Sequence, residues 1–240
     1  MVDVVYPLSS GSRHNDWELR YSLRSLEKYA LGLDRVFVVG HNPAWLTGVV
    51  HLPHHAPHAN KDADIIHKLR LACNSGISDR FIFASDDQCI LQTVDLRSLP
   101  AYYRSKPKCK SKWISRLRAA IRYTKQHGGP GFHFDTHTWQ PHCRTEFLNA
   151  TQDAPYNIGN GFTVNTLVLN LSPSIPKQPV GKDCRLRLRR KRHGNDDGLL
   201  HQLQTHVHLG YNDDAMTPKF RQTLQSLFPT PSHFEIVPNQ

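Results

Sequence analysis

Residues 80–91 of the chain read Arg-Phe-Ile-Phe-Ala-Ser-Asp-Asp-Gln-Cys-Ile-Leu. The apolar run at 81–84 is typical of a strand buried in a parallel sheet, and it ends abruptly at Ser85, Asp86 and Asp87. Two adjacent carboxylates at such a strand end lose hydration and repel each other unless a cation neutralises them. Ligands bind at the carboxyl edge of an open α/β sheet. This edge therefore indicates either a magnesium or manganese ion that bridges the protein to a phosphate, or a plain polar loop.

The segments before this strand alternate between strands and helices. Apolar runs predict strands at 2–6, 35–40 and 49–52, and helical periodicity predicts helices at 17–31 and 61–74. Asp62, Lys68 and Arg70 are expected on the exposed face of the second helix. A β-α-β-β-α-β order with right-handed crossovers predicts an α/β fold with a mostly parallel central sheet flanked by helices. The 240 residues suit a single domain.

The chain is strongly basic, with a formal net charge of +10. This balance favours an anionic partner, such as nucleic acid, a phosphorylated donor or an acidic membrane surface. Basic residues gather at 104–125 and 185–192, and the second segment holds six cations in eight positions. Its Arg/Leu alternation predicts a strand with one basic face, or a solvated hairpin. The candidate nucleic-acid contacts are Lys108, Lys110, Arg187, Arg189, Arg190 and Arg192.

Several features bear on the compartment of the protein. The five cysteines are dispersed without a Cys-x-x-Cys pair, which favours reduced thiols. The start of the chain is too short and strand-like for a signal peptide, and no apolar run approaches the roughly 20 residues of a membrane span. We therefore expect a cytoplasmic protein without a membrane partner. The oligomeric state is left open.

A small, polar loop follows the first strand. Residues 8–16 read Leu-Ser-Ser-Gly-Ser-Arg-His-Asn-Asp, and Asp16 is a candidate N-cap. A strand, a Gly/Ser-rich loop and a helix N-terminus together can receive a phosphate or a nucleotide, although a plain βα connection has the same pattern. Later in the chain, the apolar residues between Gly161 and Asn170 predict a strand.

Several segments resemble Stealth-type sugar-phosphate transferases in the same order along the chain. Residues 2–6, 18–29 and 36–39 resemble their first region, 80–87 their second, and 212–214 with 227–235 their later regions. This resemblance implies one GT-A glycosyltransferase domain over 1–240, with a nucleotide-sugar half (1–95) and an acceptor half (96–240). The chain is shorter than those enzymes, and in its compactness it resembles phage glycosyltransferases that decorate hydroxymethylated DNA bases.

The resemblance also implies a metal site. In GT-A enzymes an Asp-x-Asp-like pair binds a divalent ion that grips the donor diphosphate, and here Ser85 stands in the place of the first Asp. Asp87 is therefore expected as the direct ligand of manganese or magnesium, and Asp86 as a second ligand or a ribose contact. His137 and Asp213 are the candidates for a further ligand.

Other expected roles concern the donor and the chemistry. Ser9, Ser10, Gly11 and Arg13 would face the nucleotide, and Lys68 would reach the donor phosphates unless it lies on a solvated face. An inverting mechanism needs a carboxylate base for the acceptor hydroxyl, whereas a retaining one needs none in that place. By residue type, the candidates for this base are Asp135, Asp213 and Asp214.

Three functions fit these observations. The first is transfer of a sugar, from UDP-glucose, to a hydroxymethylated pyrimidine flipped out of DNA. The base would stack on aromatic side chains that otherwise pack in the core: Trp113, Phe132, Phe134 and Trp139. The second is a sugar or sugar-phosphate transferase with a saccharide acceptor. The third is a non-catalytic nucleic-acid-binding module, which leaves the Asp-ended strand unexplained.

Overall fold

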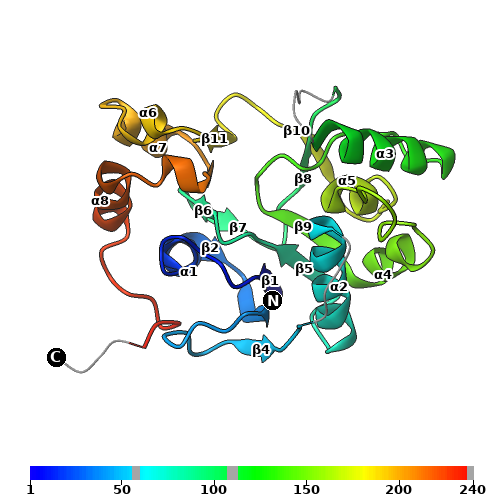
Figure 1. Ribbon diagram of the computed structural model, residues 1–240, viewed down its shortest axis with the longest axis horizontal. Coiled ribbons are helices and arrows are strands. Elements are labelled where there is room, and N and C mark those ends of the chain that lie inside the picture. Colours follow the sequence, from blue (N-terminus) through cyan, green and yellow to red (C-terminus); the bar gives the residue numbers. More distant parts are fainter. Residues whose placement is uncertain (56–59, 107–112, 237–240) are drawn as a thin grey trace.

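The computed structural model describes residues 1–55, 60–106 and 113–236, so that the predicted contacts Lys108 and Lys110 lie outside the described residues. A five-stranded sheet with the order β4-β3-β1-β5-β9 forms its centre (Figure 1). Its strands are β1 (Val2–Leu8), β3 (Leu33–Gly40), β4 (Val50–Leu52), β5 (Arg80–Phe83) and β9 (Gln140–Cys143). All neighbours pair in parallel except β5 and β9. The predicted α/β fold with a mostly parallel sheet is confirmed.

Two helices cover opposite faces of the sheet. They are α1 (Trp17–Tyr29) and α2 (Lys61–Asn74). Val4 of β1 belongs to the same buried cluster as Leu23 of α1, whereas Val5 belongs to the cluster of Ile66 on α2. Successive side chains of a strand point to opposite faces, so one central strand supports both helices. Both helices follow loops that leave the carboxyl ends of parallel strands, and their N-termini therefore begin at one edge of the sheet.

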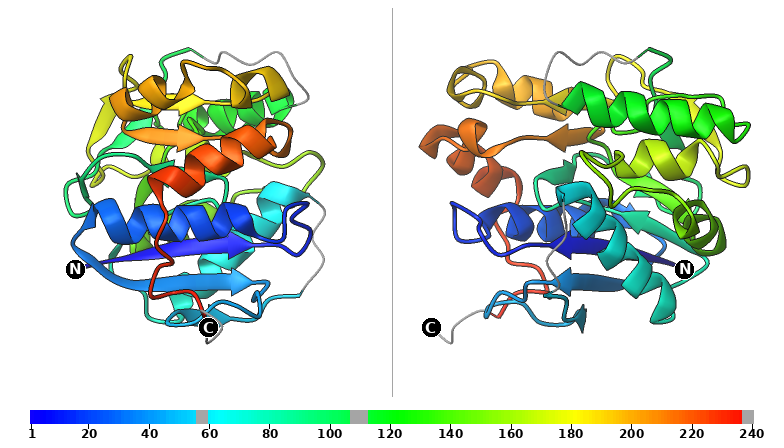
Figure 2. Two further views of the ribbon diagram at one scale, coloured as in Figure 1. Left: turned by 90° about the vertical axis from the view of Figure 1, so that its left-hand side faces the viewer. Right: turned by 45° about the vertical axis from the view of Figure 1, so that its right-hand side comes forward.

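The rest of the chain packs around this layer (Figures 1 and 2). A second sheet has the order β11-β12-β6, and two small sheets pair β2 with β7 and β8 with β10. Their bounds are β2 (Ala30–Leu31), β6 (Gln88–Ile90), β7 (Val94–Asp95), β8 (Ala101–Tyr103), β10 (Lys177–Pro179), β11 (Arg185–Arg187) and β12 (His208–Gly210). The other helices are α3 (Trp113–Gln126), α4 (Arg144–Gln152), α5 (Val164–Leu169), α6 (Lys191–Gly194), α7 (Leu199–Thr205), the 3₁₀ turn η1 (Asp213–Ala215) and α8 (Pro218–Leu227). No helix in the described ranges has the length and apolar character that crossing a bilayer requires.

The structure corrects three sequence-based expectations. The expected strand at 161–170 contains helix α5, because the carboxylate of Asp135 accepts the backbone N–H groups of Asn165 and Thr166 in its first turn. Lys68 was expected to be exposed, but it is only 4% exposed. The basic run at 185–192 is a strand only at β11, and its last two residues begin α6.

The C-terminal segment is tied to helix α1 by a buried ion pair. Glu235 accepts hydrogen bonds from Arg24 Nε at 2.7 Å and Nη2 at 2.8 Å, and from Arg20 Nη1 at 2.8 Å. The Thr47 N–H donates to the Phe234 carbonyl at 2.9 Å, which joins the same segment to the loop between β3 and β4. Figure 2 shows this red segment descending from α8 past α1. The first and last segments of the Stealth-type resemblance therefore lie together.

A buried ammonium group fixes the end of the central strand. Lys68 Nζ donates to the Leu8 carbonyl at 2.8 Å and to Ser9 Oγ at 3.0 Å, and it pairs with Asp64 at 2.7 Å. Gly40 lies against this group with a φ of +108°, and a Cβ there would collide with the Leu8 carbonyl and lie 2.9 Å from Lys68 Cε. Only glycine fits both the conformation and the space.

We expect Gly40→Ala to destabilise the protein by about 1–3 kcal/mol more than Gly128→Ala. Gly128 also has a positive φ, of +82°, but has open space around its Cβ position. Both variants therefore carry the cost of a left-handed alanine, and only the first adds a collision. Urea unfolding followed by circular dichroism measures the difference. Equal free energies of unfolding for the two variants would show that the collision at position 40 has no energetic cost.

Candidate active site

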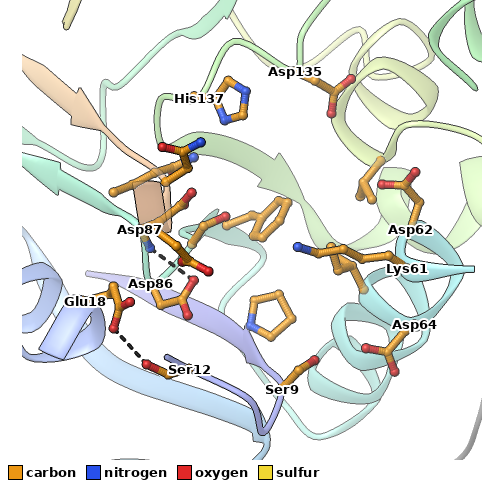
Figure 3. Close-up of a pocket in the computed structure, with 18 of the residues that line it drawn as sticks. Ser9, Ser12, Glu18, Lys61, Asp62, Asp64, Asp86, Asp87, Asp135 and His137 are labelled. Carbon is orange, nitrogen blue, oxygen red and sulfur yellow. Dashed lines mark hydrogen bonds between the residues drawn. The ribbon is translucent and has the colours of Figure 1, made fainter. Parts of the chain in front are cut away.

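A pocket of about 600 Å³ opens at the carboxyl edge of the central sheet. It is bounded by the loop after β1, the first turns of α1 and α2, the β5–β6 turn, the segment at 135–138 and η1. In Figure 3, Asp135 and His137 lie at one end, Ser9 and Ser12 at the other, and Asp86 and Asp87 between them. Nearly all of the residues that the sequence nominated for the donor, the metal and the acceptor base line this pocket: Ser9, Ser10, Gly11, Arg13, Ser85, Asp86, Asp87, Asp135, His137, Asp213 and Asp214.

The carboxyl pair lies in the β5–β6 turn. The Asp87 N–H donates to Asp86 Oδ1 at 3.0 Å. Burial, together with the charge of Asp87, raises the pKa of Asp86 to about 7. Burial also raises the pKa of Asp87, against the opposing effect of Arg187, whose Nη1 lies 3.6 Å from Asp87 Oδ2. The pair is thus short of positive charge, and a divalent cation would supply it.

Lys61 supplies part of that charge. It is the first residue of α2, and its side chain extends from the helix toward the carboxyl pair in Figure 3. Its charge lowers the pKa of both Asp86 and Asp87. Lys68, the lysine that the sequence nominated, does not line the pocket, and its ammonium group is already bound by three oxygen atoms. The pocket-lining lysine of α2 is therefore Lys61.

Three further ligand atoms gather beside the pair. One atom each from His14, Glu18 and Asp213 lie within 4.8 Å of one another. Among the described residues, nothing hydrogen-bonds to the buried Nε2 of His14, while Glu18 accepts a hydrogen bond from Ser12 Oγ at 3.0 Å. Carboxylates suit magnesium and manganese, and an imidazole nitrogen favours a transition metal. These donors fit a divalent ion, either with the carboxyl pair or as a set of their own.

Asp135 and His137 occupy the other end of the pocket. Besides the two backbone N–H groups of α5, Asp135 accepts a hydrogen bond from the Thr166 hydroxyl at 2.6 Å, and these bonds hold its carboxylate in one orientation. Burial and the nearby cations of Arg187, Arg185 and Arg189 lower the pKa of His137 to about 2, so this imidazole is neutral. The same positive surroundings oppose a divalent cation at His137.

Sequence reasoning missed several residues that line the pocket: Glu18, Lys61, Asp62 and Asp64. All four lie in the first turn of α1 or α2, and the signal was available, because both helices begin at the ligand-binding edge of the sheet. Asp62 was expected to be exposed, but it is 4% exposed and pairs with Arg116 Nη1 at 2.5 Å. Burial outweighs this pairing and raises the pKa of Asp62 to about 7.

The aromatic side chains proposed to stack on a base separate into two groups. Trp113 lines the pocket and is 39% exposed. Phe134 and Trp139 are fully buried in the core, and Phe132 is stacked on Tyr103 at 4.2 Å. Core packing therefore accounts for the last three.

The basic residues of 185–192 also fall into two groups, those that line a cavity and those that are exposed outside it. Arg187 points inward and lines the pocket, whereas Arg190 and Arg192 are exposed outside it. Arg189 is exposed as a residue but borders a smaller cavity next to the pocket. The run is thus not a single basic face.

Comparisons with known proteins identify the fold. No family model and no curated protein matched the sequence. Among solved structures, the apo structure of the bifunctional glycosyltransferase WbbM matches with a TM-score of 0.56 and 10% sequence identity, over 96% of this chain and 50% of that one. The chain spans about half the length of that protein. It therefore has a glycosyltransferase-type α/β fold.

The raised pKa of Asp86 predicts how the stability of the metal-free protein depends on pH. The folded state holds this proton up to about pH 7, whereas an unfolded Asp releases it near pH 4. Asp86 therefore makes unfolding easier as the pH rises from about 4 to 7. Asp86→Asn should stabilise the protein by about 1–3 kcal/mol at pH 8 and have little effect near pH 4.5. Chemical unfolding in EDTA measures this difference.

The control is Asp183→Asn, which makes the same charge change at an exposed residue. It should leave the pH profile unchanged. A profile that is the same in Asp86→Asn and the parent protein would mean that Asp86 is not an energetically costly charge.

Proposed function

We propose that this protein is a metal-dependent glycosyltransferase with a nucleotide sugar as its donor. One observation carries the proposal: the charge-deficient pair Asp86 and Asp87 ends a central strand inside a large pocket of a glycosyltransferase-type fold. A plain loop gives no reason to place two adjacent carboxyl groups where both are partly buried. A non-catalytic nucleic-acid-binding module gives none either.

The residues of the chain have separate tasks in this proposal. Asp87, with Asp86 beside it, would hold a manganese or magnesium ion, which stabilises charge on the departing nucleoside diphosphate. Ser9, Ser10 and Gly11 form an exposed rim at the end of β1 that offers polar contacts to the nucleotide. Lys61 adds a positive charge near the diphosphate.

The proposed base for the acceptor hydroxyl is Asp135. It lies at the end of the pocket away from Ser9 and Ser12 (Figure 3), where an acceptor would meet the sugar of the donor. Its three hydrogen bonds from α5 keep its carboxylate in place. Asp213 is an alternative base by residue type, but its carboxylate belongs to the cluster with His14 and Glu18. Its Oδ2 also lies 3.7 Å from Arg13 Nε.

A hydroxymethylated pyrimidine in DNA, with UDP-glucose as the donor, is one candidate for the acceptor. The net charge of +10 and the exposed side chains of Arg190 and Arg192 support the binding of an extended polyanion on the surface beside the pocket. A saccharide acceptor is the second candidate, favoured by the inward orientation of Arg187, which is unavailable to a duplex on the surface.

Turnover with labelled nucleotide sugars tests the proposal directly. The protein is incubated with manganese, a labelled UDP-sugar, and plain or hydroxymethylated duplex DNA. Transfer to the modified DNA alone supports the DNA acceptor, and donor hydrolysis without labelled DNA favours a saccharide. Asp87→Asn should lower either activity at least 100-fold, about the loss of one transition-state contact. Absence of both donor binding and turnover in the parent protein would refute the proposal.

Manganese affinity distinguishes the two possible sets of metal ligands. If the carboxyl pair holds the ion, Asp87→Asn should weaken manganese binding at least tenfold in titration calorimetry. Glu18→Gln and His14→Gln should weaken it less, and Asp183→Asn should have no effect. The reverse order would place the ion with His14, Glu18 and Asp213 instead.

A further inference from the structure

A second cavity, of about 200 Å³, adjoins the pocket at the end of Asp135 and His137. The two cavities share Trp113, Asp135, His137 and Arg187. Four arginines line the smaller one: Arg104, Arg185, Arg187 and Arg189. They come from the end of β8 and from the segment that begins with β11, so the fold brings together positive charges that are about 80 residues apart in the sequence.

These arginines are poorly neutralised. Among the residues that the structure describes, Asp135 is the one carboxylate that lines the cavity, and its oxygens already accept three hydrogen bonds from α5. In the described part of the chain, neither Arg104, Arg185 nor Arg189 forms an ion pair with a carboxylate. Burial, with the charges of Arg104, Arg187 and Arg189, lowers the pKa of Arg185 to about 10. Holding these groups together is costly without an anion.

One donor atom of an arginine that lines the cavity is also left unused. Arg187 donates from Nη1 to the Tyr211 carbonyl at 3.0 Å, but its buried Nε has no hydrogen-bond partner among the described residues. Arg185 donates from Nη1 to the Thr136 carbonyl. A buried N–H group without a partner costs free energy, so an acceptor atom from a ligand would be favourable here.

We propose that this arginine cavity binds a phosphate group carried by the acceptor substrate. Guanidinium forks match phosphate oxygens in bidentate pairs, and several forks around one small cavity suit a compact dianion. The cavity is smaller than those that hold a drug-sized ligand, so it fits a terminal group rather than a nucleotide. It adjoins the end of the pocket occupied by Asp135, the proposed base, and not the loop at 9–13. This proposal rests on the proposed glycosyltransferase function and specifies its acceptor class.

The burial of these side chains favours a phosphate monoester over the backbone of a duplex. Arg104, Arg185 and Arg187 are half-buried, and Arg187 is directed toward Asp87 inside the pocket. A duplex backbone lies on the surface and is followed by exposed cations, such as Arg190 and Arg192. A small phosphorylated acceptor can place its phosphate in the cavity and its hydroxyl group beside Asp135.

Titration calorimetry with glucose 6-phosphate, and with glucose as the uncharged control, tests the cavity. The parent protein should bind the phosphate ester and not glucose. Arg185→Gln and Arg104→Gln should each weaken binding at least tenfold. The matched control Arg122→Gln removes the same charge from an exposed position on α3, the helix that carries Trp113, and should leave the affinity within twofold. Arg189→Gln, at a more exposed residue, provides a third variant if a buried substitution impairs folding.

Two further measurements separate this proposal from neighbouring ones. Binding of UDP with manganese should survive Arg104→Gln and be lost in Asp87→Asn, so a failure of donor binding would affect the proposed function and leave the phosphate result interpretable. No binding of glucose 6-phosphate to the parent protein, or an equal loss in Arg122→Gln, would overturn the arginine cavity as a phosphate site. A competition experiment gives a third contrary outcome. Duplex DNA would displace glucose 6-phosphate from the parent protein, and substitution of Arg190 or Arg192 would weaken this displacement as much as substitution of Arg185.

Discussion

The central constraint on this protein is the pair of adjacent carboxyl groups, Asp86 and Asp87, at the end of a buried strand. Burial raises the pKa of both groups, and the charge of Asp87 raises that of Asp86 further, so the charged pair is tolerated only with positive charge nearby. Lys61 and Arg187, from two other elements, provide part of it. The arrangement of the loops around the pocket can thus be understood as a response to one electrostatic requirement.

The fold meets this requirement through the edge at which its helices begin. Because β1, β4 and β5 run in the same direction, the loops that lead into α1 and α2 leave the same edge of the sheet as the carboxyl pair. Lys68 then binds the end of β1 to α2, and the space for its side chain exists because position 40 is a glycine. Helix α2 thus carries one lysine that is buried for a structural purpose and another, Lys61, that is exposed and lines the pocket.

Local sequence patterns predicted those parts of the molecule that depend on local interactions. The predicted bounds of the helix at 61–74 were correct, because they depend on local signals. These are the apolar periodicity of the helix itself and the cap by Asn60, whose side chain accepts the Ala63 N–H three residues later. The expected strand at 161–170 was wrong, because the cap of α5 comes from Asp135, about 30 residues earlier in the chain. The positions of Lys68 and Arg187 also depend on distant partners, Leu8 and Asp87. The pocket residues were nominated from their positions after predicted strands and from the order of the segments that resemble known transferases. The direction of each side chain, however, depends on the tertiary structure.

Opposite charges are separated between the pocket and the cavity that adjoins it, and this polarity constrains the chemistry that they can support. Carboxylates gather around Asp86, Asp87 and Glu18, and arginines gather beyond His137. The contact between Asp87 and Arg187 marks the boundary between the two groups. Two anionic substrates placed side by side would repel each other unless each had its own positive partner. A cation at the carboxylates would serve one anion and the arginines the other, so the separation of charge favours a reaction between a phosphorylated donor and an anionic acceptor.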